Sequence, residues 1–197
     1  MKKSEATKAK LLASSGRAFR REGYAGIGVD SIAKDAGVTS GAFYAHMKSK
    51  NDAFRAALIA GLEDVLSALT AYRETHGNEW PTAFAEYYLG HDHRLDLEGA
   101  CAMTSLTPDV VRADPEVQSE YVTLMERIVK EVAKHLPDAG LTQDRDAKAW
   151  AFLSALIGGL TLARAVGPGP AADEIERASK AAALAVIGLQ GTHSKGS

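Results

Sequence analysis

The sequence predicts an all-α protein, in which an N-terminal three-helix domain is joined by a long helix to a larger helical domain. Apolar residues recur at helical spacing along most of the chain, and hardly any stretch alternates apolar and polar residues as a strand would. Only six of the 197 residues are proline, and 46% are hydrophobic, which is enough to bury a core at this length. We place the first domain at residues 1–50, the second at residues 51–190 and a flexible tail at residues 191–197.

The composition favours a cytoplasmic protein with a basic N-terminal part. Cys101 is the only cysteine, which excludes a disulfide within the chain and fits a reducing compartment. The residues after Met1 are charged rather than apolar, so we expect no secretion. Residues 1–55 contain 11 Lys and Arg against 5 Asp and Glu (+6), whereas residues 56–197 contain 12 against 20 (−8). A basic head on an acidic body is typical of a protein that touches nucleic acid with the head alone.

The first helix is expected at Ser4–Glu22. Leu12, Gly16 and Phe19 recur at i, i+4 and i+7, which places them on one face of this helix. Basic residues surround the other faces, and most of these are expected to be simply solvated. Gly23 is expected to end the helix, because glycine commonly follows the last helical residue.

The next stretch predicts a helix-turn-helix unit. Ser31–Ala36 is expected to form a short helix that Gly37 ends, because glycine accepts the left-handed conformation found after helices. Thr39 or Ser40 then supplies a side-chain oxygen that caps a second short helix, Ser40–His46. Two short helices joined by a glycine-containing turn form the unit whose second helix enters the DNA major groove, although an ordinary helical hairpin fits the same residues.

Residues from about Lys8 to Phe54 resemble the N-terminal domain of TetR-family transcriptional regulators. The matching residues are Ala18-Phe19, Gly23-Tyr24, Ile32-Ala33, Ala36-Gly37-Val38, Gly41, Phe43-Tyr44, Lys48-Ser49-Lys50 and Phe54. The resemblance implies a ligand-responsive regulator, a repressor that binds a palindromic operator as a homodimer. Three positions depart from the family pattern. Gly28 replaces a Ser or Thr that caps the second helix and touches a phosphate, Met47 replaces an aromatic residue, and Asn51 replaces an acidic residue.

The resemblance also implies which residues touch double-stranded DNA. The DNA-binding candidates are Thr39, Ser40, Gly41, Ala42, Tyr44, His46, Lys48 and Lys50. The first four are expected to face base edges and the other four to bind phosphates. Because the helix carries no Arg, Asn or Gln, we expect part of the DNA sequence to be read through van der Waals contacts and DNA shape. Tyr44 could instead belong to the core, and His46 could be merely solvated.

Three features are predicted in the first half of the larger domain. A long helix begins at Ser49 or Asn51 and runs to about Tyr72, which connects the basic head to the rest of the chain. A second helix is expected at Trp80–Leu89, since a proline is tolerated in its first turn. The polar residues of Gly90–Ala100 predict a loop.

The following segment is expected to be helical in pieces. Cys101–Val111 predicts a short apolar helix that Pro108 bends or divides. Asp114 is a good cap for the next helix, and Pro137–Leu141 predicts a turn.

The last two helices are expected to form a dimer interface. Asp144–Val166 contains no charge from Ala149 to Ala163, which is too short for a membrane span of about 20 residues. A helix that is apolar all round must be buried all round, so we expect it to pack on its own core and on a second subunit together with Asp173–Leu189. The interface candidates are Leu156, Leu160, Ala182, Val186 and Leu189.

The middle helices carry aromatic and methionine residues that resemble the apolar effector cavities of the family. The candidates for binding an unknown small-molecule effector are Phe84, Tyr87, Tyr88, Met103, Leu106, Tyr121, Leu124, Met125, Trp150 and Leu153. Taken singly, each of these residues is also a normal core residue. Because cationic side chains are scarce among them, the effector is not expected to be strongly anionic.

Other classes of function have weaker support in the sequence. His91, Asp92 and His93 look like metal ligands, but no second cluster completes a set of four, so we expect neither metal nor cofactor. No Ser/His/Asp arrangement and no paired carboxylates indicate an enzyme. Two alternatives stay open: a regulator that senses oxidants or electrophiles through Cys101, whose thiol lies at a predicted helix start, and a small all-α ligand-binding protein or enzyme.

Overall fold

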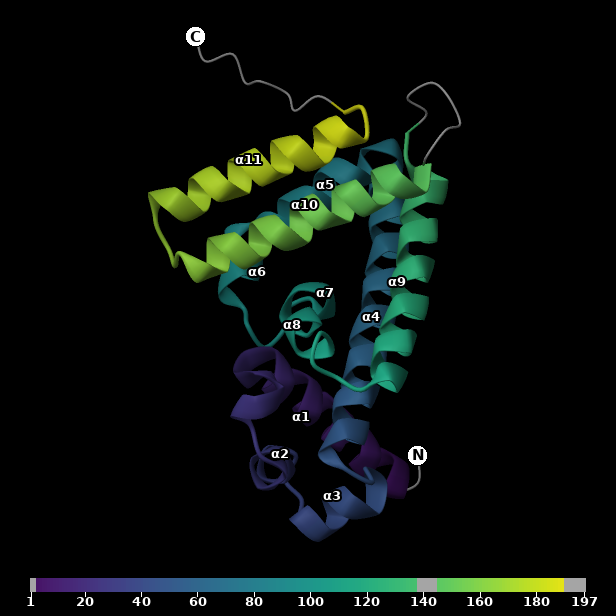
Figure 1. Cartoon of the computed structure of the whole chain (residues 1–197), viewed down its shortest axis with the longest axis vertical. Helices are drawn as coiled ribbons and strands as arrows, with labels where there is room; N and C mark the ends of the chain where they lie inside the picture. The colour runs from purple at the N-terminus through teal and green to yellow at the C-terminus, as the bar shows by residue number, and fades with distance from the viewer. Residues whose placement is uncertain (1–2, 138–144, 190–197) are drawn as a thin grey trace. The chain divides into compact units, whose positions relative to one another are not determined.

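The computed structural model describes residues 3–137 and 145–189 (Figure 1). Over these ranges the chain forms eleven α-helices, one short 3-10 helix and no strand, which confirms the predicted all-α class.

The chain divides into two compact units. One contains the residues up to 65 together with residues 96–124, and the other contains residues 66–95 and the residues from 125 onward. The functional boundary proposed at residue 50 stays a prediction.

The first unit holds the N-terminal helices and a later segment of the chain. Its helices are α1 (Lys3–Gly26), α2 (Val29–Asp35), α3 (Ser40–His46), the first part of α4 (Lys50–His76), α7 (Ala102–Ser105), α8 (Thr107–Val110) and the first part of α9 (Pro115–His135). Within α1, Gly23 has a non-helical conformation with φ 73°, so the main helix ends where the sequence predicts.

Aromatic and aliphatic side chains form the core of the first unit. Phe19 and Phe54 pack edge to face with ring centroids 5.4 Å apart, and Ile32 and Phe43 are fully buried. The buried hydroxyl of Ser14 donates a hydrogen bond of 2.9 Å to the carbonyl oxygen of Ile32. The helix α2 is thus anchored on α1, and α3 packs on α2 and buries Phe43 in the core.

Polar contacts connect the N-terminal helices to the segment 96–124. Arg20 donates to the carbonyl oxygen of Glu98 over 2.7 Å, and the backbone N–H of Tyr24 donates to Asp109 over 2.8 Å. Arg55 of α4 forms a bidentate ion pair with Glu120 of α9 and a second ion pair with Glu116. The hydrogen bonds from Arg55 hold the pKa of Glu120 below its usual value, so this contact persists at neutral pH.

The second unit holds the other helices and the later parts of α4 and α9. Its own elements are the 3-10 helix η1 (Gly77–Glu79), α5 (Trp80–Leu89), α6 (His91–Leu95), α10 (Arg145–Ala165) and α11 (Pro170–Val186). The helices α10 and α11 lie side by side (Figure 1). Arg145, the first residue of α10, donates to the carbonyl oxygens of Ala133 and Leu136 at the end of α9 over 2.7 and 2.6 Å. This contact satisfies carbonyl groups that a helix end leaves unpaired.

Several element boundaries differ from those predicted. The helix α4 continues four residues beyond Tyr72 to His76, because the next four residues lack a helix breaker and Gly77, with φ 52°, comes only after them. The helix α11 begins at Pro170 rather than Asp173, because proline suits the first turn of a helix. The predicted division of the Cys101–Val111 helix is confirmed, with Leu106 between α7 and α8.

The loop predicted at Gly90–Ala100 is partly wrong, because residues 91–95 form the helix α6. The side chains of His93 and Arg94 are buried in it, and Arg94 pairs with Asp173 of α11 over 3.0 Å. Packing against other helices therefore stabilises α6, although its polar sequence does not predict a helix. Most of the turn predicted at Pro137–Leu141 and the tail at residues 191–197 lie outside the described residues.

Candidate nucleic-acid interface

Backbone geometry at the turn defines how α2 meets α3. The N–H of Gly37 donates to the carbonyl oxygen of Lys34, and the N–H of Val38 donates to that of Ala33 over 2.9 Å. Gly37 has φ 70°, a conformation that glycine adopts at little cost and that other residues adopt rarely. The chain therefore reverses within four residues, as expected for a helix-turn-helix unit.

The first turn of α3 is held by two side chains. Thr39 is the N-cap, and its hydroxyl accepts the N–H of Ala42 over 3.2 Å, which decides between the two capping candidates. The hydroxyl of Ser40 donates to Asp30 of α2 over 2.5 Å. Asp30 was not singled out from the sequence. Its contact with Ser40 joins residues ten positions apart on two different helices, and such a contact leaves no periodic signal in the sequence.

The face of α3 turned away from the core is small and accessible. Phe43 and Met47 are buried and anchor the helix, whereas Thr39 and Gly41 are exposed and Ala42 is half-buried. A Cβ atom added at Gly41 would meet only the hydroxyl oxygen of Thr39 at 3.8 Å. The arrangement lets the backbone of α3 approach another surface closely, as a helix in the major groove must.

Larger polar side chains flank this small face. Tyr44 is 56% exposed although its ring packs edge to face on Phe43, with centroids 5.4 Å apart. Its hydroxyl group is therefore not confined to the core. Lys48 is exposed and His46 is half-buried. The ammonium group of Lys50 lies 4.6 Å from the centroid of the Tyr24 ring, a cation–π contact that orients the lysine.

Each of the two acidic residues of α2 interacts with another side chain of the same chain. Asp30 accepts the hydroxyl of Ser40, and Asp35 forms an ion pair of 2.6 Å with Arg17. The contacts with the side chains of Ser14 and Arg17 lower the pKa of Asp35. These contacts reduce the repulsion that two carboxylates would exert on a nearby phosphate backbone.

The start of α2 lacks a side-chain cap. Gly28 is its N-cap and makes no side-chain hydrogen bond, and a Cβ atom added there would meet nothing within 4 Å. The family's usual Ser or Thr would therefore fit at this position, and its hydroxyl contact is missing in this chain.

The effector candidates differ in their surroundings. Those that are buried are Phe84, Tyr88, Met103, Leu106, Leu124, Met125 and Leu153. Tyr121 is half-buried, its hydroxyl lies 2.8 Å from that of Thr107, and burial raises its pKa. Tyr87 and Trp150 are exposed. A cavity of about 10 Å³ and an open hollow of about 590 Å³ lie in the second unit, and none of these candidates lines either of them.

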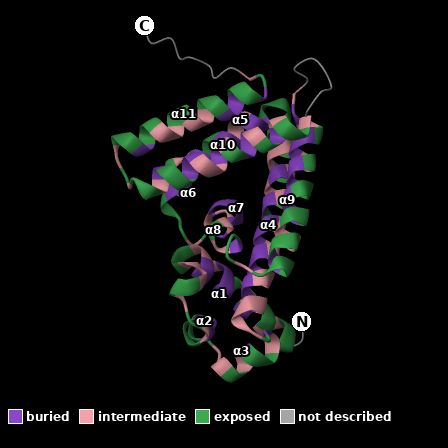
Figure 2. Cartoon of the chain, viewed as in Figure 1, coloured by how far each residue is buried: buried purple, intermediate pink, exposed green. Residues whose placement is uncertain are grey.

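The interface candidates also separate into two groups. Leu156 and Leu160 are fully buried by the chain itself, so in this conformation they are not available to a second subunit. Ala182 and Val186 are exposed, and Leu189 is half-buried. The sequence missed the exposed apolar residues Leu162 of α10 and Val166, which directly follows that helix, because a helix with apolar residues on all sides does not reveal which side faces its own core. Buried, intermediate and exposed residues all occur along α10 (Figure 2).

Cys101 and the HDH sequence remain outside any described site. Cys101 is half-buried before the first residue of α7, near enough to Arg20 to interact with it electrostatically, and its role as a sensor stays a prediction. Nδ1 of the buried His93 lies 2.7 Å from the carbonyl oxygen of Tyr88.

Among the described residues, no group of three or more His, Cys, Asp or Glu side chains is placed to hold a metal ion. In the same ranges, every helix is too short or too polar to span a bilayer.

Comparison with known proteins gives one family. Residues 11–57 match the family of bacterial regulatory proteins described as the tetR family. A search of curated proteins found no match. A TetR-family transcriptional regulator from Cytophaga hutchinsonii has a similar structure, with a TM-score of 0.79 and 18% identity over 98% of this chain and 99% of that chain.

Two further solved structures share the fold. Escherichia coli NemR in its reduced form is 18% identical, with a TM-score of 0.77 over 95% of this chain and 98% of that chain. A putative transcriptional regulator from Saccharomonospora viridis, solved in complex with choline, is 19% identical, with a TM-score of 0.72 over 90% of this chain and 94% of that chain. At these identities the likeness concerns the fold.

Proposed function

We propose that the chain, whose residues 11–57 match the tetR family of bacterial regulatory proteins, is a transcriptional repressor that binds a palindromic operator as a homodimer. We further propose that a small, largely apolar effector releases it from DNA. We propose that the protein acts in the cytoplasm only by binding DNA and the effector, without a cofactor or a catalytic step.

The observation that carries the proposal is the accessible, small-faced helix α3. Phe43 and Met47 fix one side of it in the core, and the N-cap Thr39 and the bond from Ser40 to Asp30 fix its first turn. The opposite side can then lie against base edges, while Tyr44, His46, Lys48 and Lys50 bind the phosphates. Phosphate contacts position the helix and base contacts select the sequence.

Charge supports the same assignment. The excess of Lys and Arg lies in residues 1–55, and the excess of Asp and Glu lies in the rest of the chain. Attraction to DNA is therefore concentrated on the part of the chain that carries α3, and the acidic remainder opposes non-specific binding.

The proposed dimer forms through α10 and α11. A single recognition helix reads only a few base pairs, whereas two of them related by a two-fold axis read half-sites about one DNA turn apart. Trp150 and Leu162 on α10, Val166 directly after α10 and Val186 on α11 are large apolar side chains that the chain leaves exposed. A second copy that covers them would satisfy the expectation of a helix buried on all sides.

The proposed interface leads to a prediction for Leu162. Replacing it by Asp is expected to convert the dimer into a monomer at micromolar concentration and to weaken operator binding on the order of 100-fold or more, because the half-sites are then bound singly. Sedimentation analysis and a DNA titration measure the two effects. Val122 of α9 is the matched control, since it is 53% exposed and Leu162 is 57% exposed. If Leu162→Asp stays dimeric, or Val122→Asp dissociates equally, the interface lies elsewhere.

The effector is proposed to bind among the buried aromatic and aliphatic residues of the second unit. The centroid of the Phe84 ring lies 5.5 Å from that of Tyr88 and 5.5 Å from that of Tyr72 of α4. A ligand that displaces Phe84 would therefore also press on α4. Such a ligand lowers DNA affinity if it favours an arrangement in which the two recognition helices no longer match the half-sites, as linkage requires.

Two arginines near this region already have partners. Arg94 pairs with Asp173 and Glu176, and Arg164 donates to the carbonyl oxygens of His93 and Arg94. Nη1 of Arg94 is buried without a hydrogen-bond partner among the described residues, but an anionic effector that reached this guanidinium would have to compete with Asp173 and Glu176, which favours a neutral or apolar effector. The choline complex of the regulator from Saccharomonospora viridis is in keeping with a small ligand that carries no negative charge.

The experiment that tests the proposal is selection of bound sequences from a library of random DNA duplexes. Inverted repeats with half-sites about one helical turn apart, bound by two protomers, are the expected result. Enrichment of no sequence, or of single half-sites bound by one protomer, would contradict the proposed mode of binding.

A further inference from the structure

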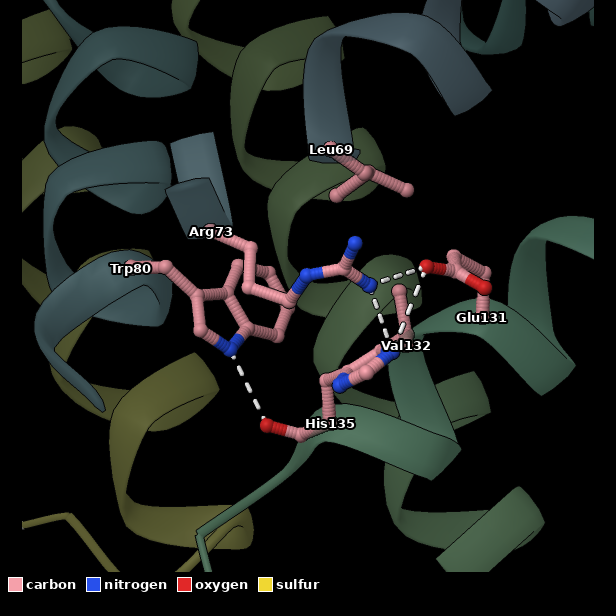
Figure 3. Close-up of a pocket in the computed structure, with 6 residues that line it drawn as sticks. All are labelled: Leu69, Arg73, Trp80, Glu131, Val132 and His135. Carbon is pink, nitrogen blue, oxygen red and sulfur yellow. Dashed lines mark hydrogen bonds and ion pairs between the residues drawn. The ribbon is translucent and has the colours of Figure 1, made fainter. Parts of the chain in front are cut away.

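Three polar side chains meet in the second unit around a cavity of about 10 Å³ (Figure 3). Arg73 comes from the last turn of α4, and Glu131 and His135 come from the end of α9. The remaining lining residues are Leu69, Trp80 and Val132. We call Arg73, Glu131 and His135 the Arg–Glu–His cluster. The side chain of each is between 27% and 29% exposed.

The hydrogen bonds of the Arg–Glu–His cluster define the protonation state of His135. Nη1 of Arg73 lies 2.6 Å from Oε1 of Glu131 and 2.5 Å from Nε2 of His135. A guanidinium group has donors and no acceptor, so Nε2 of His135 must accept the hydrogen bond. The imidazole is therefore neutral in this arrangement, with its proton on Nδ1.

A second proton on His135 is incompatible with this arrangement. It would sit on Nε2 and point at an N–H of Arg73, so two donors would face each other across 2.5 Å. The nearest alternative acceptor is Oε1 of Glu131, 3.4 Å from Nε2, and Arg73 already binds that oxygen. The imidazolium and the guanidinium would thus compete for one carboxylate.

The surroundings of the ring favour its neutral form. Arg73 faces it from α4, Lys134 and Glu131 belong to its own helix α9, and Arg145 approaches from α10. Partial burial and, next, the charge of Arg73 lower the pKa of His135. His135 also lines the open hollow of about 590 Å³ together with Glu79 of η1, so protons from solvent can reach the ring.

The backbone at His135 is fixed while its side chain is free to exchange partners. The indole N–H of Trp80, the first residue of α5, donates to the carbonyl oxygen of His135 over 3.0 Å (Figure 3). Charging the ring is thus expected to displace the side chain of Arg73 rather than the end of α9. Because Arg73 lies in the last turn of α4, its displacement acts on that turn.

We propose that the Arg–Glu–His cluster is a proton-sensitive attachment of the C-terminal end of α4 to the end of α9. Neutral His135 shares Arg73 with Glu131, and protonated His135 takes the carboxylate of Glu131 and releases Arg73. The attachment weakens as the pH falls through the pKa of His135 in the folded protein, which lies below the ordinary histidine value of about 6.5. The inference does not depend on what the protein binds, so it stands or fails independently of the proposed DNA-binding function.

The direction of the pH effect follows from the lowered pKa. Between the pKa of His135 in the folded protein and about 6.5 in the unfolded chain, the unfolded chain binds more protons. The stability contributed by neutral His135 is therefore fully present above about pH 6.5 and is lost as the pH falls through that interval.

Two measurements test the proposal. An NMR titration of the wild-type protein should show a His135 pKa below 6.5, and amide exchange should show reduced protection of residues 70–76 at pH 5.0 relative to pH 7.0. His135→Gln keeps a neutral acceptor for Arg73, so its residues 70–76 should keep their protection. Its melting temperature should fall about 2–4 °C less than that of the wild type over the same pH range.

His91→Gln is the matched control, because His91 is exposed at the start of α6. This variant should follow the wild type at every pH. The proposal is overturned if His135 titrates at or above 6.5, or if His135→Gln loses stability and amide protection with acidification as the wild type does.

Discussion

Replacing Gly41 with Glu is expected to lower the affinity of the protein for its operator on the order of 100-fold or more. Gly41 lies in the first turn of α3, and space is open around its Cα. A glutamate side chain would fill the gap through which the helix approaches the bases, and its charge would face phosphates, where juxtaposed like charges cost several kcal/mol. Stability should hardly change, because the residue is exposed and glutamate is a better helix former than glycine.

Two control variants separate the interface from other effects. Ser119→Glu adds the same charge at an exposed position of α9 and is expected to reduce affinity less than about 3-fold, as distant exposed charges are screened by salt. Gly41→Ala adds only a methyl group and should cost far less than Gly41→Glu. DNA titrations followed by fluorescence anisotropy measure these affinities, with melting temperatures as the check on folding. Equal binding by Gly41→Glu and the wild type would show that α3 does not read DNA.

The second large effect is expected at Gly159, where α10 packs closely on α11. A Cβ atom added at Gly159 would lie 2.4 Å from Cβ of Ser179 and 3.1 Å from a methyl group of Leu89. Cβ of Ser179 cannot rotate away, so Gly159→Ala forces the two helices apart. Overpacking of this kind costs about 1–3 kcal/mol of unfolding free energy, and each kcal/mol lowers the melting temperature by about 2–4 °C in a chain of this size.

Gly158 supplies a control one position earlier on the same helix. A Cβ atom added there would meet nothing within 4 Å, so Gly158→Ala should stabilise the protein by about 0.5–1 kcal/mol through the lower conformational freedom of alanine. Denaturant unfolding of both variants measures the difference. If Gly159→Ala is as stable as Gly158→Ala, the close packing of α10 on α11 is not present in solution.

Local signals explain why much of the N-terminal unit could be predicted. Thr39 caps α3 by a bond to a residue three positions away, and Asp114 caps α9 by a bond to Val117 over 3.0 Å. Gly37 ends α2 within a single turn. Each of these interactions is completed within about four residues, so the residue types and their spacing were sufficient to indicate them.

Contacts between distant parts of the chain could not be predicted in the same way. The Arg–Glu–His cluster joins residues 58 and 62 positions apart, and Arg55 and Glu120 are 65 positions apart. The sequence also predicted that Leu156 and Leu160 lie at the dimer interface. In the structure, both side chains are buried in the core of the chain itself. Apolar residues on every side of α10 leave its rotation undetermined until neighbouring helices are placed.

In the proposed mechanism, the helix α3 of each protomer of a dimer takes part in selecting one DNA sequence. The most direct measurement is the salt dependence of the affinity for a duplex taken from upstream of the protein's own gene, compared with a scrambled duplex. With at least two lysines per protomer, Lys48 and Lys50, at phosphates, log K should fall with a slope of about −3.6 or steeper against log salt concentration. The upstream duplex should bind on the order of 1,000-fold more tightly than the scrambled one. A monomer that binds both duplexes equally, or binds neither at low salt, would contradict the claim.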